Sequence, residues 1–384
     1  MIYRDRQITP SQIGQQLKAA YVLTGSLRRS GNRLRITTQL VDTDTEFSMW
    51  SERYDSEMKD VFELQDEIAR KTAEALRVTL SPQELEALAS KPTEDLKAYD
   101  LYLRGRRYAR MQTQKEMEFA VQMFENAVAM DKSFALAYAA CATVSASLYY
   151  KYGRDASLVD RARDASSKAV ALRWDLPEVQ LSQAWVLYVT GLHNEAVKMV
   201  CKAIERKKDC EGAYYLLCWA LFSAGRHQEV ADVVETALDA SGEDYNVYVP
   251  ILNSLHTLGK EELRGKILGR QVAAIENYLK EAPEDARARI HLSVSYAELH
   301  RVEDSRRELN LAMTLRANDP SILYNAACAY CQLQKKAEAL DALRKAWDAG
   351  FRDATRVRRD PHLTLLHGDL EFERLYPDTT AAES

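Results

Sequence analysis

The chain has 384 residues and a formal net charge of −5; 46% of the residues are apolar and 28% are charged, as is ordinary for a folded globular protein. Single compact cores rarely grow past ~300 residues, so we expect several domains or a modular solenoid. The net charge gives no overall nucleic-acid-binding footprint, and no apolar run approaches the ~20 residues of a membrane-spanning helix.

Residues 1–80 are predicted to form a small mixed α/β domain. A helix is expected over Ser11–Ala20, where the Ser can cap the first turn. Two strands, YVLTGSLRR and RLRITTQLVD, follow and are joined by SGN, whose Gly and Asn suit positive φ. The second run alternates apolar and polar residues, as a half-buried strand does. Phe47–Asp55 is a candidate third strand, and residues 60–80 have strong helical periodicity.

The segments YVLTGS, SGNRLRI and WSERYD, in this order and followed by VFELQDEIARKTAEAL, resemble the later part of the TolB amino-terminal-like domain. The resemblance runs from residue 17 to residue 76. It implies a module of bacterial signalling proteins that commonly precedes tetratricopeptide repeats. The family's domain opens with a further strand and helix. We therefore expect a partial domain, which is either truncated or exposes a sheet edge through which the protein could form a homo-oligomer.

After residue 80 the strand pattern disappears. Residues 81–95 contain two Pro and many charged residues, and we interpret them as a linker. From residue 96 to about residue 353, helical periodicity is interrupted only by short turns containing Gly, Asp or Pro. The predicted fold is therefore mainly α.

The helical region repeats itself every 34 residues. GLHNEAVKMVCKAIE returns as GRHQEVADVVETALD, so that Gly191 and Gly225 are 34 residues apart. A two-helix unit of this length is the signature of tetratricopeptide repeats (TPRs). The sequence predicts a TPR superhelical solenoid of about seven repeats. Four of them follow the pattern without gaps, namely residues 177–210, 211–244, 286–319 and 320–353; residues 96–133, 134–176 and 245–285 carry insertions.

Each helical hairpin must stack on the next, because it cannot bury its apolar stripe alone. Gly191 and Gly225 suit a left-handed turn, and Ala at the close contacts lets helices approach: Ala196, Ala203, Ala237, Ala312, Ala339 and Ala346. His193 and His227 occupy equivalent places in successive repeats, which raises the possibility of a metal pair. We favour solvent-facing turn positions instead, since no carboxylate or Cys is patterned with them.

The segment from Ala346 to Tyr376 resembles the closing segment of bacterial TPR proteins of the same signalling group. The resemblance rests on an Asp-Pro-x-Leu…Leu…Asp-x-x-Phe phrase, filled here by Asp360, Pro361, Leu363, Asp369 and Phe372. It implies that residues 354–376 cap the apolar face of the last repeat. Residues 377–384 are expected to be a disordered tail.

Motifs for catalysis or cofactor binding are absent from the sequence. It contains no Walker-type loop, Gly-x-Gly-x-x-Gly, Gly-x-Ser-x-Gly or His-Glu-x-x-His. The CAYC motif, Cys328 to Cys331, invites a zinc or redox interpretation, but no second Cys pair lies downstream. We predict no enzyme activity, cofactor or metal. All six Cys are expected to be reduced and metal-free, as in a cytoplasmic protein.

The TPR resemblance implies a binding site. In TPR solenoids the second, fifth, ninth and twelfth residues of each first helix typically line the concave groove. In three repeats these are Glu178, Leu181, Trp185 and Tyr188; Gly212, Tyr215, Trp219 and Phe222; and Ser321, Tyr324, Cys328 and Cys331. Trp and Tyr are enriched in binding hot spots. The alternative is that these side chains pack between first helices as core. If they form a binding wall, Trp185, Trp219 and Phe222 are partly exposed.

These patterns favour a non-catalytic TPR scaffold or regulatory protein that binds a protein or peptide partner in its groove. The family resemblances imply a bacterial signalling or transcription-regulating system, where such arms accompany adenylate or guanylate cyclases, kinases or winged-helix domains. One alternative is the truncated regulatory part of a cyclase or kinase. Another is a nucleic-acid-associated regulator that uses the basic hairpin of Arg28, Arg29, Arg33 and Arg35, although the overall charge makes nucleic acid the less favoured partner.

Overall fold

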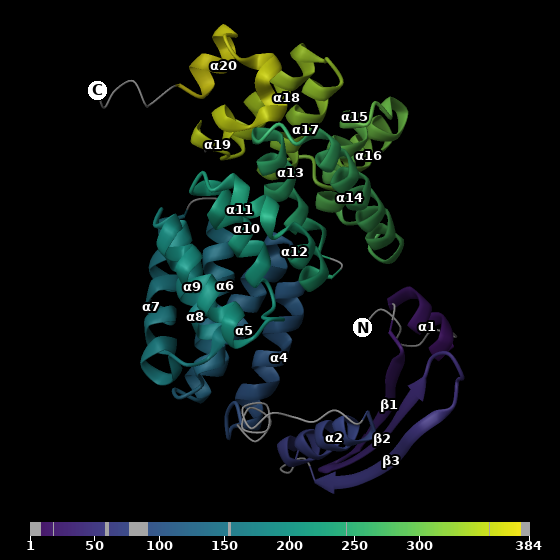
Figure 1. The fold of residues 1–384 in the computed structure, drawn as a ribbon. Coiled ribbons are helices and arrows are strands. Elements are labelled where there is room, and N and C mark those ends of the chain that lie inside the picture. The colour runs from purple at the N-terminus through teal and green to yellow at the C-terminus, as the bar shows by residue number, and fades with distance from the viewer. Residues whose placement is uncertain are drawn as a thin grey trace. The chain divides into compact units, whose positions relative to one another are not determined.

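The structure is a computed structural model, and it describes residues 9–17, 19–57, 61–76, 91–152, 155–242, 244–352 and 354–377. The chain divides into two compact units, residues 1–99 and residues 100–384. Figure 1 shows the elements of both, and each unit is described by itself below. The predicted linker lies largely outside the described residues, and so does the predicted tail apart from residue 377.

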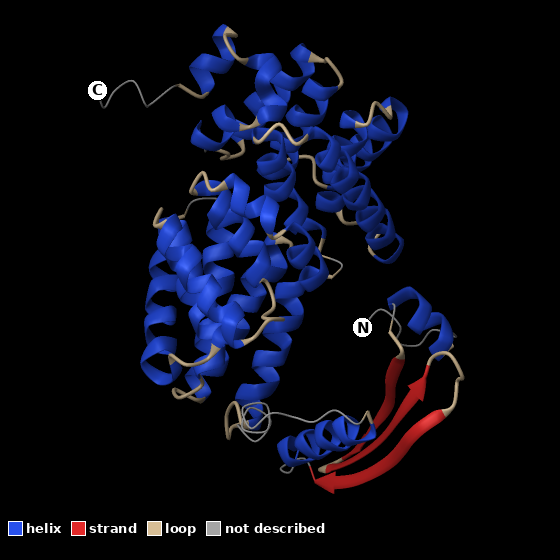
Figure 2. Cartoon of the chain, in the orientation of Figure 1, coloured by secondary structure: helices blue, strands red, loops and turns tan. Residues whose placement is uncertain are grey.

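The first unit contains a three-stranded antiparallel sheet in the order β1-β2-β3 (Figure 2). Its strands are β1 (Tyr21–Ser30), β2 (Arg33–Asp42) and β3 (Ser48–Glu57), and its helices are α1 (Pro10–Leu17) and α2 (Val61–Ala75). All five elements were expected from the sequence. Helix α1 ends at Leu17, before the predicted end at Ala20, whereas residues 60 and 77–80 of the second predicted helix lie outside the described residues.

The hairpin between β1 and β2 closes through two residues. Gly31 takes the left-handed conformation with φ of 60°, which costs glycine little. Asn32 does not have a positive φ, so that part of the prediction was wrong. The register places Leu23 opposite Leu40 and Leu27 opposite Ile36, which puts these side chains on one face of the sheet.

Strand β1 lies at one edge of this sheet and pairs with β2. Leu23 is 47% exposed and Leu27 is 62% exposed, so the apolar face is incompletely covered along this strand. An exposed edge with apolar side chains can pair with another chain. Self-association through β1 stays a prediction.

The second unit is built from seven helix pairs in its described part, as a TPR-like solenoid requires. The first helices of the pairs are α4 (Leu96–Arg110), α6 (Ala135–Tyr152), α8 (Pro177–Val189), α10 (Ala213–Ser223), α13 (Tyr248–Thr257, preceded by η2, Tyr245–Val247), α15 (Ala286–Glu298) and α17 (Pro320–Gln332). The second helices are α5 (Gln114–Met130), α7 (Ala156–Arg173), α9 (His193–Arg206), α11 with α12 (His227–Asp232 and Val234–Ser241), α14 (Glu261–Glu281), α16 (Val302–Leu315) and α18 (Lys336–Asp348).

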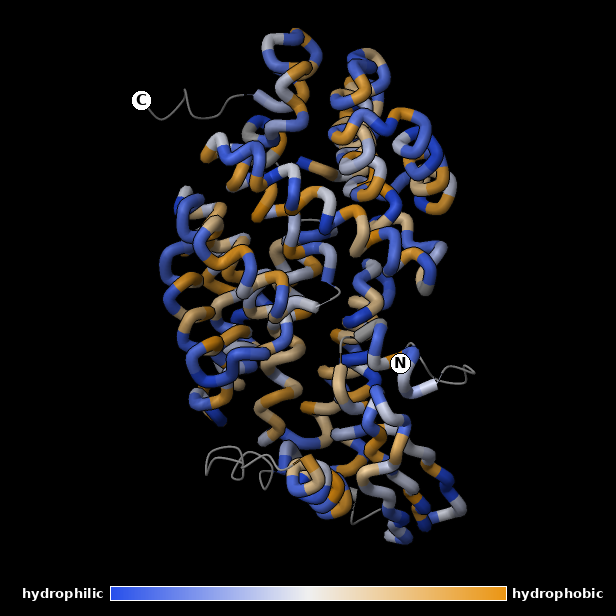
Figure 3. The backbone as a smooth tube through the Cα atoms, turned by 45° about the vertical axis from the view of Figure 1, so that its right-hand side comes forward, coloured by the Kyte–Doolittle hydropathy of each residue, from blue (hydrophilic) through white to orange (hydrophobic). Residues whose placement is uncertain are grey.

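The Gly and Ala residues that recur in the predicted repeats explain how the helix pairs stack. Gly191 and Gly225 have φ of 85° and 73°, so each turn uses the left-handed conformation that was expected. The small residues predicted at close contacts are all fully buried: Ala196, Ala203, Ala237, Ala312, Ala339 and Ala346. Hydrophobic and hydrophilic residues are interspersed along the helices (Figure 3), as in helices that bury one face and expose another. The mainly helical repeat fold is therefore confirmed.

The residues after the last pair cap its apolar face, as the closing phrase implied. They form α19 (Ala354–Arg359), η3 (Pro361–Leu366) and α20 (Leu370–Leu375). Leu363 and Phe372 are fully buried in one cluster with Leu343 of α18. Asp360 and Asp369 cap η3 and α20 by accepting backbone N–H bonds.

The solenoid curves until α6 of the second pair meets α17 of the seventh. The Ser321 hydroxyl donates a hydrogen bond of 2.9 Å to the carbonyl oxygen of Lys151, 170 positions away in sequence. The concave side is thereby enclosed between the first helices, and this enclosure creates the pocket described next.

Candidate functional site

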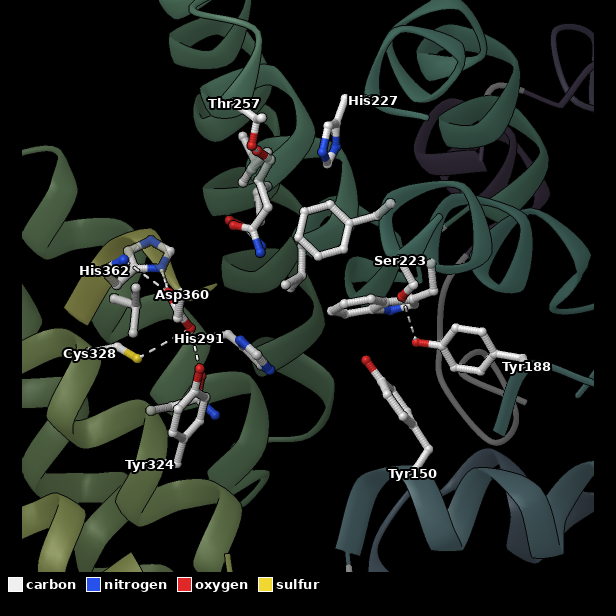
Figure 4. Close-up of a pocket in the computed structure, with 18 of the residues that line it drawn as sticks. Tyr150, Tyr188, Ser223, His227, Thr257, His291, Tyr324, Cys328, Asp360 and His362 are labelled. Atoms are coloured by element: carbon white, nitrogen blue, oxygen red, sulfur yellow. Dashed lines mark hydrogen bonds and ion pairs between the residues drawn. The ribbon is translucent and has the colours of Figure 1, made fainter. Parts of the chain in front are cut away.

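A pocket of about 660 Å³ occupies the concave side of the solenoid. Its lining comes from α6, α8, α10, α13, α14, α15, α17 and η3, together with the turns before α9 and α11. Figure 4 shows side chains from opposite sides of the solenoid pointing into this space. The volume lies within the ~300–1,000 Å³ typical of ligand sites.

One side of the pocket is aromatic, and we call Tyr150, Tyr188, Trp219 and Phe222 the aromatic wall. The Tyr150 ring lies 5.3 Å from that of Tyr188 and 5.5 Å from that of Trp219, both edge-to-face. Trp219 also meets Phe222 at 5.8 Å, again edge-to-face. These rings come from α6, α8 and α10, so stacking of three successive repeats assembles the wall.

Of the seven predicted groove residues, four line the pocket and three do not. Tyr188, Trp219, Phe222 and Tyr324 line the pocket. The other three, Leu181, Trp185 and Tyr215, are buried between helices rather than in its lining. All three belong to one buried hydrophobic cluster, in which the rings of Trp185 and Tyr215 are 6.1 Å apart.

Trp185, Trp219 and Phe222 were expected to be partly exposed if they form a binding wall, and for the two Trp residues this was wrong. Trp185 is 4% exposed and Trp219 is 8% exposed, so neither indole is free in the sense expected of a binding anchor. Phe222 is half-buried, as expected. Trp219 lines the pocket and is packed among the rings of Tyr150, Tyr215 and Phe222.

His193 and His227 were expected to face solvent, and this was wrong. Both are partly buried and line the pocket. His193 packs against Tyr188 at 5.4 Å and His227 against Phe222 at 5.3 Å. Burial lowers the pKa of each imidazole. The glycine turns direct these residues inward, which the spacing of the repeats alone did not reveal.

The opposite side of the pocket is hydrogen-bonded, and we call Glu298, Tyr324, Asp360 and His362 the polar wall. His362 lies between two carboxylates: Nδ1 is 2.8 Å from Asp360 Oδ1, and Nε2 is 2.8 Å from Glu298 Oε1. The Tyr324 hydroxyl donates to Asp360, and Arg264 pairs with Glu298. The wall therefore joins α14, α15, α17 and the cap.

These contacts fix the charges of the polar wall. Burial alone would lower the pKa of His362, but Asp360 and Glu298 raise it to about 10. Burial alone would raise the pKa of Asp360, but His362 and its hydrogen bonds lower it to about 2. Burial likewise opposes ionisation of Glu298, yet His362 and Arg264 hold its pKa below the ordinary value. His362 is thus a cation between two anions at neutral pH.

The CAYC motif lies in α17, the first helix of the last pair, as predicted. Cys328 and Cys331 are each 2% exposed, and the Cys328 thiol lies 3.8 Å from Asp360 Oδ2. Burial raises the pKa of Cys331 to about 12, which keeps the thiol protonated. All six Cys are free thiols. In the described ranges, no group of three or more His, Cys, Asp or Glu is arranged to hold a metal ion.

The basic hairpin of the first unit is partly neutralised. Arg28 stands opposite Arg35 across the β1–β2 ladder. Arg35 pairs with Asp55 of β3 at 2.6 Å, and Arg53 shares the same carboxylate at 3.2 Å. These pairs are more than half exposed, so they contribute little stability.

The sequence did not identify three residues of the polar wall as site residues: Glu298, Asp360 and His362. It also missed His291, which lines the pocket. Asp360 was recognised only as part of the closing phrase, which concerned capping. Glu298 and His362 are 64 positions apart and follow no repeat pattern. An Asp-Pro-His run directly after the last repeat is the one sequence signal that pointed toward this cluster.

Comparison with known proteins supports the fold. No protein-family model matches the chain. A protein of Rhizobium meliloti (strain 1021) with the name "Putative adenylate cyclase 3" is 35% identical over 144 residues, 37% of this chain and 24% of that protein. The chain thus spans about a quarter of the length of this relative.

Two solved structures resemble the chain at low identity. The human IFIT1 dimer with m7Gppp-AAAA is 14% identical, with a TM-score of 0.51 over 85% of this chain and 75% of that one. A TPR protein of Thermus thermophilus is 19% identical, with a TM-score of 0.32 over 57% and 95% of the respective chains. The first is a likeness of fold alone, and the TM-score of the second is too low to support an argument. No helix in the described part of the chain has the length and apolar character to span a membrane.

Proposed function

We propose that the chain is a non-catalytic scaffold or regulatory protein that binds a protein or peptide partner in the pocket between the aromatic and polar walls. The observation that carries this proposal is the pocket itself: about 660 Å³, enclosed by first helices and lined by aromatic rings on one side. Concave, mostly apolar sites with a few fixed polar groups are what ligands occupy.

The two walls supply different parts of recognition. Phe222 is half-buried beside Trp219, so it offers apolar area to a partner side chain. The carboxylates of Asp360 and Glu298 are held in place by His362, so they offer fixed acceptors. A partner peptide with one bulky apolar residue and a nearby donor fits this arrangement.

We further propose a cytoplasmic role in a bacterial signalling system, as the regulatory part of a longer cyclase-like protein or beside one. The support is the 35% identity to part of the Rhizobium meliloti relative. Binding to nucleic acid through the hairpin is the rival. It has less support because Arg35 already pairs with Asp55.

The proposal is tested with peptides selected on the purified protein. A random 12-residue peptide library is panned on the full chain, and the enriched peptides are measured by fluorescence polarisation. We expect Phe222→Ala to weaken their binding about tenfold or more, equivalent to ~1.4 kcal/mol. Phe119→Ala is the matched control, since Phe119 is 37% exposed and lies on α5 outside the pocket.

Selected peptides that bind both variants as tightly as the wild type would place recognition elsewhere. The rival is examined with a single-stranded oligonucleotide titrated at rising salt. Micromolar affinity with a steep salt dependence, lost in Arg28→Gln, would favour the hairpin instead.

A further inference from the structure

Two cations meet inside the solenoid, beside Tyr150 and Trp219 of the aromatic wall. Lys151 is near the end of α6, and Arg287 is in the first turn of α15. Both line a small cavity of about 40 Å³ between α6, α10, α15 and α17. The function proposed above makes no use of either residue.

Neither cation has an anionic partner among the described residues. Lys151 Nζ contacts the side-chain oxygen of Gln112 and lies 5.3 Å from the centre of the Tyr215 ring. The Arg287 guanidinium lies beside Tyr152, and its Nη1 is buried with no hydrogen-bond partner. Within the part of the chain that the structure describes, no carboxylate is within ion-pair distance of either cation.

The nearest acidic side chains are already engaged. Asp244 Oδ1 accepts from the backbone N–H of Asn246 at the start of η2. Asp285 Oδ1 caps α15, and its Oδ2 accepts from the Tyr278 hydroxyl. Asp319 caps α17. These carboxylates make the electrostatic potential at Lys151 and Arg287 less positive from a distance, but none of them forms an ion pair with either cation.

The two cations repel each other, and no ion pair within the described residues offsets this repulsion. Burial lowers the pKa of Lys151 well below its ordinary value, and the positive charge of Arg287 lowers it further. Buried charges are normally paired, because an unpaired cation loses its hydration without compensation. An anionic group in the cavity would offset both the repulsion between the two cations and their loss of hydration.

We infer that Lys151 and Arg287 form a binding site for a single oxyanion group, the carboxylate or phosphate of a ligand. A water needs ~10–15 Å³ of such space, so this cavity accommodates about three water-sized groups, the scale of a carboxylate or phosphate. Arg287 Nη1 and the Lys151 ammonium can each donate a charge-assisted hydrogen bond to the anion, and such bonds are stronger than those between neutral groups.

The remainder of the ligand has room on either side. The cavity shares five residues with the 660 Å³ pocket: Tyr150, Trp219, Val249, His291 and Asn325. It shares Tyr215 and Asn246 with a second pocket of about 290 Å³. The oxyanion site is therefore at the constriction between two larger spaces.

The experiment measures the thermal unfolding midpoint of the full chain at pH 7.5 with inorganic phosphate, acetate or chloride at equal ionic strength. We expect phosphate, acetate or both to raise the midpoint by about 3 °C at 20 mM relative to chloride. A rise with phosphate alone identifies a phosphate site, and a rise with acetate alone identifies a carboxylate site.

Variants test the assignment. Lys151→Met and Arg287→Met should each abolish the anion-induced rise, while Lys151→Arg should retain it. Lys198→Met is the control, because Lys198 is exposed on α9. Without anion, Lys151→Met should unfold no earlier than the wild type, since it removes a half-buried ammonium that pairs with no carboxylate of the described residues. Two variants at separate positions keep the test valid if one of them folds poorly.

Calorimetry at pH 9 measures the protons taken up when an anion binds. A purely structural role of Lys151 would not change this number. Anion binding should take up protons in the wild type, because the bound anion favours the charged form of Lys151, and take up none in Lys151→Met. Midpoints equal in all three salts, or an anion-induced rise that survives in both Met variants, would overturn the inference. Because these probes are simple ions, the result is independent of whether any peptide binds in the pocket.

Discussion

The aromatic wall and the polar wall face the same pocket but are held in place by different forces. The aromatic wall is a packed set of rings from consecutive repeats, linked by edge-to-face contacts. The polar wall is a buried charge network that ties the cap to α14, α15 and α17. The first is a product of the repeat and follows its spacing. The second joins Tyr324, which the repeat predicted, to Asp360 and His362 of the cap, which lie outside the repeat pattern. Variants of each wall separate the two.

The largest effect is expected in the aromatic wall. Trp219→Ala should lower the free energy of unfolding by about 3–5 kcal/mol, because the 8%-exposed indole leaves a cavity among Tyr150, Tyr215 and Phe222. Urea melts measure this loss. Trp174→Ala is the control: its ring is 64% exposed, so the cost should stay below about 1 kcal/mol. Equal losses in the two variants would mean that the wall is not core.

The polar wall should depend on its central cation almost as strongly. His362→Gln leaves two buried carboxylates facing each other, so we expect a loss of about 3 kcal/mol in the same urea melts. His256→Gln is the matched control, since the His256–Glu261 contact is about half exposed and should contribute little. A loss below about 1 kcal/mol for His362→Gln would contradict a charged network.

The two walls should also differ in their response to pH. The pKa of His362 is raised to about 10 in the folded protein, whereas an unfolded His titrates near ~6.5. Its contribution to stability is therefore complete below pH ~6.5 and is lost as pH rises through about 10. Asp360, with its pKa lowered to about 2, contributes fully above ~3.9 and loses its contribution as pH falls through about 2.

Urea melts at pH 6, 8 and 10 measure this difference. The gap in stability between the wild type and His362→Gln should shrink steadily from pH 6 to pH 10. The gap between the wild type and Trp219→Ala should change much less over the same range, because burial lowers the pKa of His193 and His227, the two imidazoles that pack against the aromatic wall. A constant gap for His362→Gln would show that His362 is not charged in the folded state.

The smallest expected effects come from a matched pair of Tyr→Phe changes. Tyr324→Phe removes a hydrogen bond to the Asp360 carboxylate and should cost about 2 kcal/mol, as for bonds to charged groups. Tyr188→Phe removes a 3.4 Å contact with the neutral Ser223 hydroxyl and should cost less than about 1 kcal/mol. The reverse order would mean that hydrogen bonding, rather than ring packing, positions the aromatic wall.

Local sequence was sufficient for the elements of the first unit. Strand β2 alternates apolar and polar residues, and Gly31 marks the turn before it, so periodicity and turn chemistry predicted the hairpin. The end of α1 was predicted less well, because helix ends depend on capping and packing that periodicity does not encode.

The 34-residue repeat determined the stacking of helix pairs, the left-handed turns at Gly191 and Gly225, and the buried Ala contacts. It also identified four pocket residues, because positions that recur in each repeat face one side of the solenoid. Each of these features depends on nearest neighbours, and a repeat pattern encodes nearest-neighbour relations.

Only the tertiary structure decided how far the solenoid curves. Curvature is the sum of small rotations per repeat, so the sequence of one repeat does not reveal that Ser321 reaches Lys151. That closure turned an open groove into a pocket and left Trp185 and Tyr215 outside its lining. It also brought Lys151 beside Arg287, while folding of the cap onto the last repeats placed His362 against Glu298. These contacts join residues far apart in the chain, and no local pattern specifies them.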